Sequence, residues 1–206
     1  MFAYCLNNPS NRVDENGKDA VAVLEPASAG CAGHVGLFIQ DADGNWFYFF
    51  WGPADLSIEG TVDIITGEDV LHGAYLIPVD IQSSDFSDIN SVKSALEAAF
   101  INANISEKQY RDRVDNLFGL IYYEGDYSAS YDSAKGYVNS SIFYNLYDKN
   151  CFQVSSSILS VSNNRISKIQ ENIVTGIIPN IGFPVLYILH KVQGIINSVD
   201  AYQNAA

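Results

Sequence analysis

An early β-hairpin pattern constrains the fold of this chain more than any other feature of its sequence. Residues 34–40, HVGLFIQ, and residues 46–51, WFYFFW, are rich in the branched and aromatic residues that strands favour. The DADGN segment between them contains an Asp-Gly pair, which is a strong signal for a tight turn. We therefore predict two antiparallel strands, with His34 at the open end of the hairpin, opposite residues 51–53.

Other segments predict further strands and one amphipathic helix. Strands are expected at residues 20–25, 61–67 and 73–81, where apolar residues lie between turn signals. Residues 87–103 carry apolar residues at helical spacing and begin with Ser and Asp, which can cap a helix. Residues 122–140 are interpreted as a loop that leads into a short helix. Together these elements predict an α+β domain with an antiparallel sheet.

A second helix is predicted to begin at Cys151. Asp148 or Asn150 can cap it, because both side chains can accept hydrogen bonds from backbone N–H groups. Apolar residues follow at helical spacing, at Val154, Ile158 and Val161. A helix N-terminus has partial positive charge and free N–H groups, so a cysteine in the first turn is expected to ionise more easily than usual.

Cys151 and His34 are the candidate catalytic pair. A Cys151 thiolate could attack a carbonyl carbon while backbone N–H groups at the helix start hold the oxyanion. His34 could then protonate the leaving amine. Cys31 is a weaker candidate nucleophile because its SAGCAGH context offers no helix start. His72 and His190 compete with His34 for the role of base.

A third residue that would orient the imidazole stays unassigned. The residues predicted to lie opposite His34 have no suitable acceptor side chain: they are Trp51, Gly52 and Pro53. Nearby polar side chains are weak choices for this role: Tyr48, Asn45 and Asp55. A backbone carbonyl could also serve.

Carboxylates do not form a convincing alternative site. Glu124 and Asp126 could be compared with a glycosidase pair, but acidic residues in a Gly/Ser-rich loop are usually solvated. The full twelve-residue calcium-loop pattern is absent from the sequence. We therefore predict no metal and no cofactor.

Charge and cysteine content exclude several classes of function. The net charge is −13 with only 11 Lys and Arg, so binding to nucleic acid is not expected. The three cysteines, Cys5, Cys31 and Cys151, have neither disulfide-framework nor zinc-finger spacing. The chain does not open with a signal-peptide pattern. Prolines interrupt the apolar residues 172–189, which we interpret as core rather than a membrane span.

The first residues resemble the end of the Rhs (YD-repeat) associated core. The segment FAYCLNNPSNRVDENGKD, residues 2–19, keeps the family's characteristic positions and departs from them at Glu15. The matching positions are Asn7, Asn8, Pro9, Asn11, Asp14 and Gly17. The resemblance implies that residues 1–19 are a remnant of the Rhs core tail, followed by a bacterial toxin effector domain at residues 20–206. It also implies secretion or cell-surface display as the tip of a larger protein, and an immunity protein as a possible partner.

The order of GHVGLFI before NCFQVSSSIL resembles the circularly permuted branch of the NlpC-type papain-like cysteine peptidases. The matching positions surround His34 and Cys151. The resemblance implies a papain-like fold with the nucleophile at a helix N-terminus, and a cysteine peptidase or amidase that acts on a peptide or on the peptidoglycan stem peptide. An acyltransferase similar to lecithin:retinol acyltransferase and a non-catalytic binding module remain alternatives.

The aromatic strand, residues 46–51, has an expected place in that hydrolase. We expect His34 at the mouth of a cleft, with the aromatic strand as a core wall on one face. Its other face is expected to be a substrate-binding surface.

Overall fold

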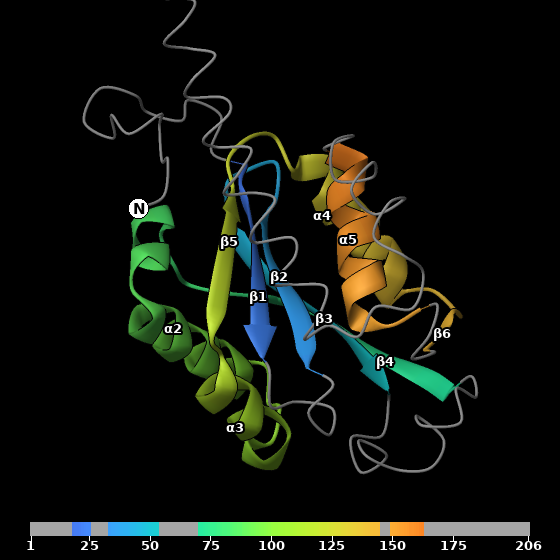
Figure 1. The fold of residues 1–206 in the computed structure, drawn as a ribbon, viewed down its shortest axis with the longest axis horizontal. Coiled ribbons are helices and arrows are strands. Elements are labelled where there is room, and N and C mark those ends of the chain that lie inside the picture. The colour runs from blue at the N-terminus through green and yellow to red at the C-terminus, as the bar shows by residue number, and fades with distance from the viewer. Residues whose placement is uncertain (1–17, 26–32, 54–69, 145–148, 163–206) are drawn as a thin grey trace, which may run out of the picture.

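The computed structural model describes residues 18–25, 33–53, 70–144 and 149–162. Within them, five antiparallel strands form a sheet in the order β5-β1-β2-β3-β4, and a two-residue strand, β6, pairs with the β4 edge (Figure 1). The bounds are β1 Ala20–Glu25, β2 His34–Gln40, β3 Trp46–Pro53, β4 Val70–Pro78, β5 Gly119–Tyr123 and β6 Phe143–Tyr144.

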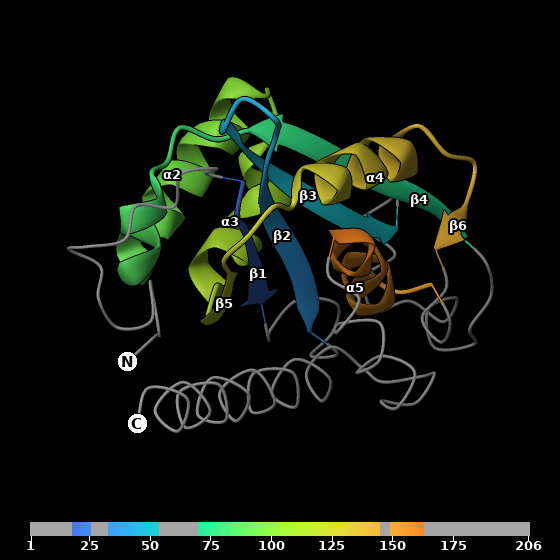
Figure 2. The same cartoon turned by 90° about the horizontal axis from the view of Figure 1, so that it is seen from above.

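Helices cover both faces of the sheet (Figure 2). One face carries the short 3₁₀ helix η3, Ser83–Ser87, with α2, Ile89–Asn102, and α3, Glu107–Asn116. The other face carries α4, Ser128–Val138, and α5, Cys151–Ser162. The structure thus confirms the coarse prediction of an α+β domain with an antiparallel sheet packed against helices.

The predicted hairpin is confirmed, and its turn is built by an aspartate. The Asp41 carboxylate accepts backbone N–H bonds from Asp43 and Asn45, each at 2.9 Å, and Gly44 has a φ of 83°. A φ in that range suits glycine, which has no Cβ. The strand pairs run from Gln40 with Trp46 to Leu37 with Phe49.

The expectation that one face of the aromatic strand, β3, binds substrate is wrong. Tyr48 and Phe50 are buried in the core beneath α2 and α3, while Phe49 and Trp51 are buried in the core beneath α5. The alternation of a strand sends side chains to both faces, and here helices pack on both. The aromatic residues therefore build two cores.

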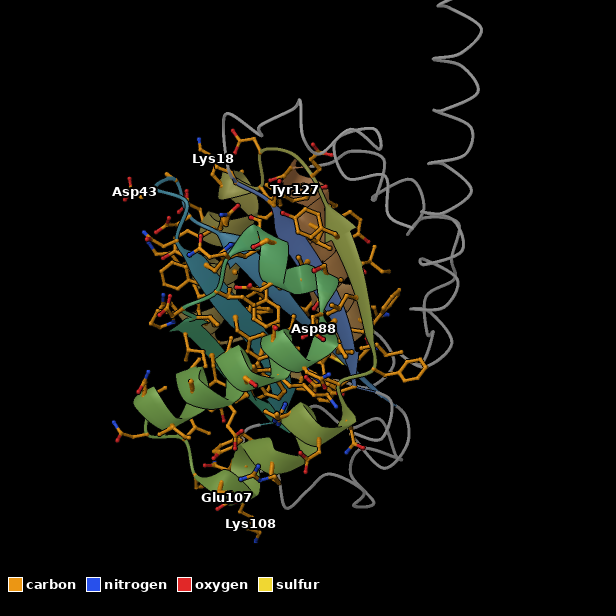
Figure 3. The ribbon with its side chains drawn as sticks, turned by 90° about the vertical axis from the view of Figure 1, so that its left-hand side faces the viewer. Lys18, Asp43, Asp88, Glu107, Lys108 and Tyr127 are labelled. Atoms are coloured by element: carbon orange, nitrogen blue, oxygen red, sulfur yellow. The ribbon has the colours of Figure 1, made fainter. Side chains whose placement is uncertain are left out.

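The helix predicted at residues 87–103 is confirmed as α2. Its cap is Asp88, whose carboxylate accepts the N–H groups of Asn90 at 3.1 Å and Ser91 at 3.3 Å. Figure 3 looks onto this face of the sheet, with Asp88 at the start of α2 and Glu107 at the start of α3. Such a cap typically stabilises a helix by about 1 kcal/mol.

Sequence reasoning missed α3 and β5. The α3 sequence, EKQYRDRVDN, is mostly charged, and its buried apolar side chains are Tyr110 and Val114. Two apolar positions are too few for a clear helical period. Strand β5 ends at Tyr123, so its last two residues overlap the start of the loop that was predicted from residue 122.

Lys18 and Asp19 pack into the domain, although the predicted boundary places them in the tail. Asp19 is buried and accepts hydrogen bonds from the Tyr122 hydroxyl and from the Gly125 N–H, the latter at 3.0 Å. The carbonyl of Lys18 accepts the N–H of Tyr127 at 2.7 Å, and the two residues lie at the same end of the sheet (Figure 3). The packed region therefore begins no later than Lys18.

Several predictions fall outside the described residues. They include the strand at residues 61–67 and the apolar residues 172–189. They also include Cys5, Cys31, Asp55, Asp148 and His190. Among the helices that the structure describes, none combines the length and the hydrophobicity needed to cross a membrane.

Gly36 provides a test of the packing on the α3 face of the sheet. A Cβ at this position would clash with the Tyr48 ring, coming within 2.7 Å of Cε2, so Gly36→Ala should destabilise the fold by about 1–3 kcal/mol. Gly136→Ala, on α4, is the matched control. A Cβ there meets nothing within 4 Å, and the helical propensity of Ala should stabilise by about 0.5–1 kcal/mol. Urea unfolding of both variants measures the contrast, and equal effects would contradict this packing.

Candidate functional site

Helix α5 begins at Cys151, as predicted. The Asn150 side chain accepts the N–H of Gln153 at 3.0 Å, and the Gln153 side chain accepts the N–H of Asn150 at 3.0 Å. This reciprocal capping box satisfies two donors at the helix start. Val154 and Ile158 are buried as expected, whereas Val161 is exposed.

Two side chains of α5 hold the backbone of Val35 on β2. The Ser155 hydroxyl donates to the Val35 carbonyl at 3.2 Å, and the Val35 N–H lies near the sulfur of Cys151, where it acts to lower the pKa of the thiol. Cys151 and Ser155 are four residues apart and so lie on the same face of the helix. Since the β2–β3 pairs end at Leu37, the neighbouring stretch of β2 is open to the helix. The thiol is thus fixed one residue from His34.

Burial makes Cys151 a neutral thiol. Removal from water, the main cause, and the nearby charge of Glu25, a smaller one, together raise the pKa of Cys151 to about 12. The N–H groups of Val35, Phe152 and Cys151 itself act in the opposite direction but do not compensate. The expected lowering of the pKa by the helix start is therefore wrong for this arrangement, because desolvation is the larger effect.

His34 is a buried, neutral imidazole beside this strand end. Its ring centroid lies 4.5 Å from that of Phe50. Burial lowers the pKa of His34 well below its usual 6.5, and the positive charge of Arg113 lowers it further. Within the described residues its Nε2 atom has no hydrogen-bond partner, so it is not bonded to the thiol here.

A buried polar cluster surrounds His34, and Tyr48 is its one member that the sequence analysis named as a candidate beside His34. Glu25, at the end of β1, is paired with His34 in the strand register and is fully buried. The Tyr48 hydroxyl donates to Glu25 Oε1 at 2.7 Å. Arg113, from α3, is also buried, with its guanidinium carbon 3.6 Å from the centroid of the Phe50 ring. The sequence did contain a signal for Glu25, because this charged residue directly follows the apolar run AVAVL.

The remaining sequence candidates do not join this cluster. Asn45 lies in the hairpin turn at the other end of β2, where it is bonded to Asp41. Asp126 is exposed and accepts hydrogen bonds from Ser128, and Glu124 is also exposed. The backbone of His72 is paired with Pro53 in the β3–β4 register.

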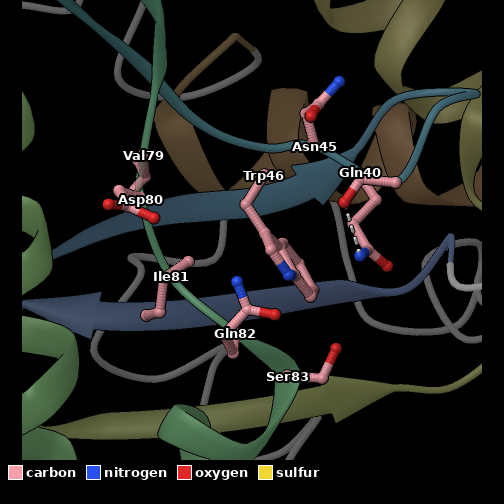
Figure 4. A pocket seen from close by; sticks show the side chains of 9 residues that line it. Gln40, Asn45, Trp46, Val79, Asp80, Ile81, Gln82 and Ser83 are labelled. Atoms are coloured by element: carbon pink, nitrogen blue, oxygen red, sulfur yellow. Dashed lines mark hydrogen bonds between the residues drawn. The ribbon is translucent and has the colours of Figure 1, made fainter.

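Small hollows lie on the described part of the chain, and two of them bear on the site. One, of about 160 Å³, lies beside the hairpin turn and is lined by polar side chains such as Gln40 and Gln82 around Trp46 (Figure 4). The other, of about 200 Å³, lies between α4 and the first two turns of α5, and Lys149, Gln153 and Val154 line it. Neither hollow is lined by Cys151 or His34.

Comparisons with protein-family models, with curated proteins and with solved structures gave no match. Within the described residues, no group of three or more His, Cys, Asp or Glu side chains is placed to hold a metal ion.

The raised pKa of Cys151 predicts a loss of stability at alkaline pH. The unfolded chain ionises this thiol from about pH 9, whereas the folded chain keeps it neutral up to about pH 12, so the free energy of unfolding falls between these values. At pH 10 the loss is about 1.4 kcal/mol. Urea unfolding of the wild type and Cys151→Ala at pH 7 and pH 10 isolates this contribution. A stability difference between the two proteins that is the same at both pH values would contradict a buried thiol.

Proposed function

We propose that this chain carries a cysteine peptidase or amidase with Cys151 as nucleophile and His34 as general base. The observation that carries the proposal is the contact of the Cys151 sulfur with the N–H of Val35, which places the first residue of α5 beside the strand end that bears His34. Nε2 of His34, which has no hydrogen-bond partner among the described residues, adds to this support, because such a buried nitrogen is available to accept a proton.

The reaction begins from a neutral pair. As the sulfur attacks the amide carbon, Nε2 of His34 takes the thiol proton, and for this step the ring must move into hydrogen-bonding range of the sulfur. We assign the role of holding the oxyanion to the N–H groups of Cys151 and Phe152 at the helix start, which act to lower the pKa of the thiol. The imidazolium protonates the amine as the C–N bond breaks. Water then attacks the thioester, and its proton passes through His34 back to the thiol.

The closed packing around the thiol sets a condition on substrate binding. Cys151 and Phe152 are only 2% and 4% exposed. A substrate carbonyl therefore reaches the sulfur only after neighbouring side chains or backbone have moved. The low exposure of the resting thiol also protects it from oxidation, because oxidation follows thiolate character and access.

The substrate and setting of the hydrolase follow from the two sequence resemblances. We place the domain in the papain-like fold of the permuted NlpC type, with residues 1–19 as the Rhs remnant and residues 20–206 as the effector. Its substrate is a peptide or the peptidoglycan stem peptide, and its setting is a secreted or surface-borne bacterial protein with an immunity protein as partner. The net charge of −13 disfavours nucleic acid as a substrate.

A non-catalytic binding module is the second candidate function. The burial of the sulfur and the raised pKa of Cys151 favour it, because a resting thiol of this kind is a poor nucleophile. The acyltransferase alternative has less support, since the aromatic side chains that suggested a lipid-facing surface are largely buried in the two cores.

Incubation with purified peptidoglycan sacculi and with soluble stem peptides tests the hydrolase proposal. The wild type should release new amino groups and form a thioester adduct on Cys151 that mass spectrometry detects. Cys151→Ala should abolish both, and His34→Ala should lower the rate by about 10²–10⁴-fold. Cys31→Ala is the matched control and should retain activity.

Cleavage by Cys151→Ala at the wild-type rate would exclude Cys151 as the nucleophile. The absence of both cleavage and adduct with every substrate would instead favour the binding module.

A further inference from the structure

Glu25 lies where a group that orients His34 is needed. The two residues are directly paired between β1 and β2, and side chains of such a pair are about 4.5–5.5 Å apart at Cβ when they share a face. They do share one: Glu25 alternates with Val21 and Val23 of the core beneath α2 and α3, and the His34 ring contacts Phe50 of the same core. The carboxylate is therefore within reach of the imidazole.

Tyr48 fixes the carboxylate from the other side of β2. Its ring lies across Gly36, where only a residue without a Cβ leaves space for the ring. Its hydroxyl donates to Glu25 Oε1 at 2.7 Å. The tyrosine thus reaches from β3 over β2 to β1. A buried carboxylate held in this way has few orientations open to it, because its hydrogen bond and the surrounding packing fix the rotamer.

We propose that Glu25, held by Tyr48, is the positioning residue of His34, and that it keeps Nε2 of the imidazole unprotonated and available for the proton of Cys151. The proposal rests on the hydrolase function proposed above. Glu25 acts through the other ring nitrogen: its carboxylate accepts the Nδ1–H, fixes the tautomer with a bare Nε2, and stabilises the imidazolium that forms during the reaction.

Glu25 is the acidic side chain among the polar groups near His34 and Cys151. Four groups from four elements surround His34 or its reaction partner: Glu25 of β1, Tyr48 of β3, Arg113 of α3 and Cys151 of α5. Arg113 disfavours the imidazolium, and Tyr48 and Cys151 are held neutral by burial. A carboxylate at Glu25 offsets Arg113 and makes transfer of the thiol proton to the ring less costly.

A second carboxylate–tyrosine pair in the same sheet, with a half-buried tyrosine, provides the matched control. Asp19 precedes β1 and lies on the same face as Glu25, and its carboxylate accepts a hydrogen bond from the Tyr122 hydroxyl. Tyr122→Phe therefore removes the same kind of contact as Tyr48→Phe, but at the end of β1 away from His34. Both variants should lower the melting temperature by similar amounts.

The test combines ¹⁵N NMR of the histidine rings with hydrolysis of the stem-peptide substrate. In Glu25→Gln and Tyr48→Phe, the ring nitrogen shifts of His34 at pH 7 should move away from those of a single fixed tautomer. The kcat should fall by about 10²-fold with little change in KM. In Glu25→Gln the acid limb of the kcat/KM profile should also move to lower pH, because the lost carboxylate lowers the pKa of His34. Tyr122→Phe should match the wild type in every readout except stability.

The two readouts separate failure of this proposal from failure of the proposed function. His34 shifts that respond to Glu25→Gln and Tyr48→Phe support the positioning role even if no substrate is cleaved. His34 shifts that stay at wild-type values in both variants overturn it, whether or not the protein is a hydrolase. Equal kinetic effects of Tyr48→Phe and Tyr122→Phe also overturn it, since they would reveal a loss of stability alone.

Discussion

The backbone of one residue, Val35, joins the two halves of the candidate site. Its N–H lies near the sulfur of Cys151 and acts to lower the pKa of the thiol, and its carbonyl accepts the hydroxyl of Ser155, so a single peptide segment lies against two successive turns of α5. This is possible because the β2–β3 pairs end at Leu37 and the two strands no longer share their hydrogen bonds beyond it. Slippage of the helix by one turn would break both contacts and take Cys151 away from His34.

The ionisation state of the site follows from a competition between burial and the helix start. The N-terminus of a helix favours a nearby negative charge by about 0.3–1 kcal/mol. The pKa of Cys151 rises from 9.0 to about 12, which corresponds to about 4 kcal/mol in the opposite direction. Desolvation therefore decides the resting state, and in the proposed mechanism the thiolate forms together with proton transfer to His34. A site of this kind depends on the orientation of its base, which gives the Glu25–Tyr48 pair its importance.

The elements with strong local signals could be predicted from the sequence. The hairpin of β2 and β3 follows from its Asp-Gly turn, α2 follows from its apolar period and Asp88, and α5 follows from the cap of Asn150. Helix α3 could not be predicted, because its stability comes from two buried apolar side chains and a capping box at Ser106 rather than from a hydrophobic period. The covering of both faces of the sheet by helices depends on tertiary packing, which the sequence of β3 does not reveal. The expected binding surface on β3 was therefore wrong.

Within the site, the sequence identified the two residues whose chemistry is unusual but not the residues that surround them. A cysteine at a helix start and a histidine at a strand end can be recognised by local context. The partner of His34 depends on the pairing of β1 with β2, which places Glu25 beside it across nine positions of the chain. No local pattern specifies that register. The neutral state of the thiol likewise depends on packing by distant segments.

Hydrogen exchange at the Val35 amide tests the central contact most directly. Amide exchange is measured by NMR in the wild type and in Cys151→Ala, with the amide of Leu37, which lies in the paired part of β2, as the internal reference. The account predicts that Cys151→Ala speeds exchange of the Val35 amide by about tenfold relative to Leu37, since one hydrogen bond is lost. An unchanged ratio would show that the sulfur does not bind this amide, and the placement of Cys151 beside His34 would then be wrong.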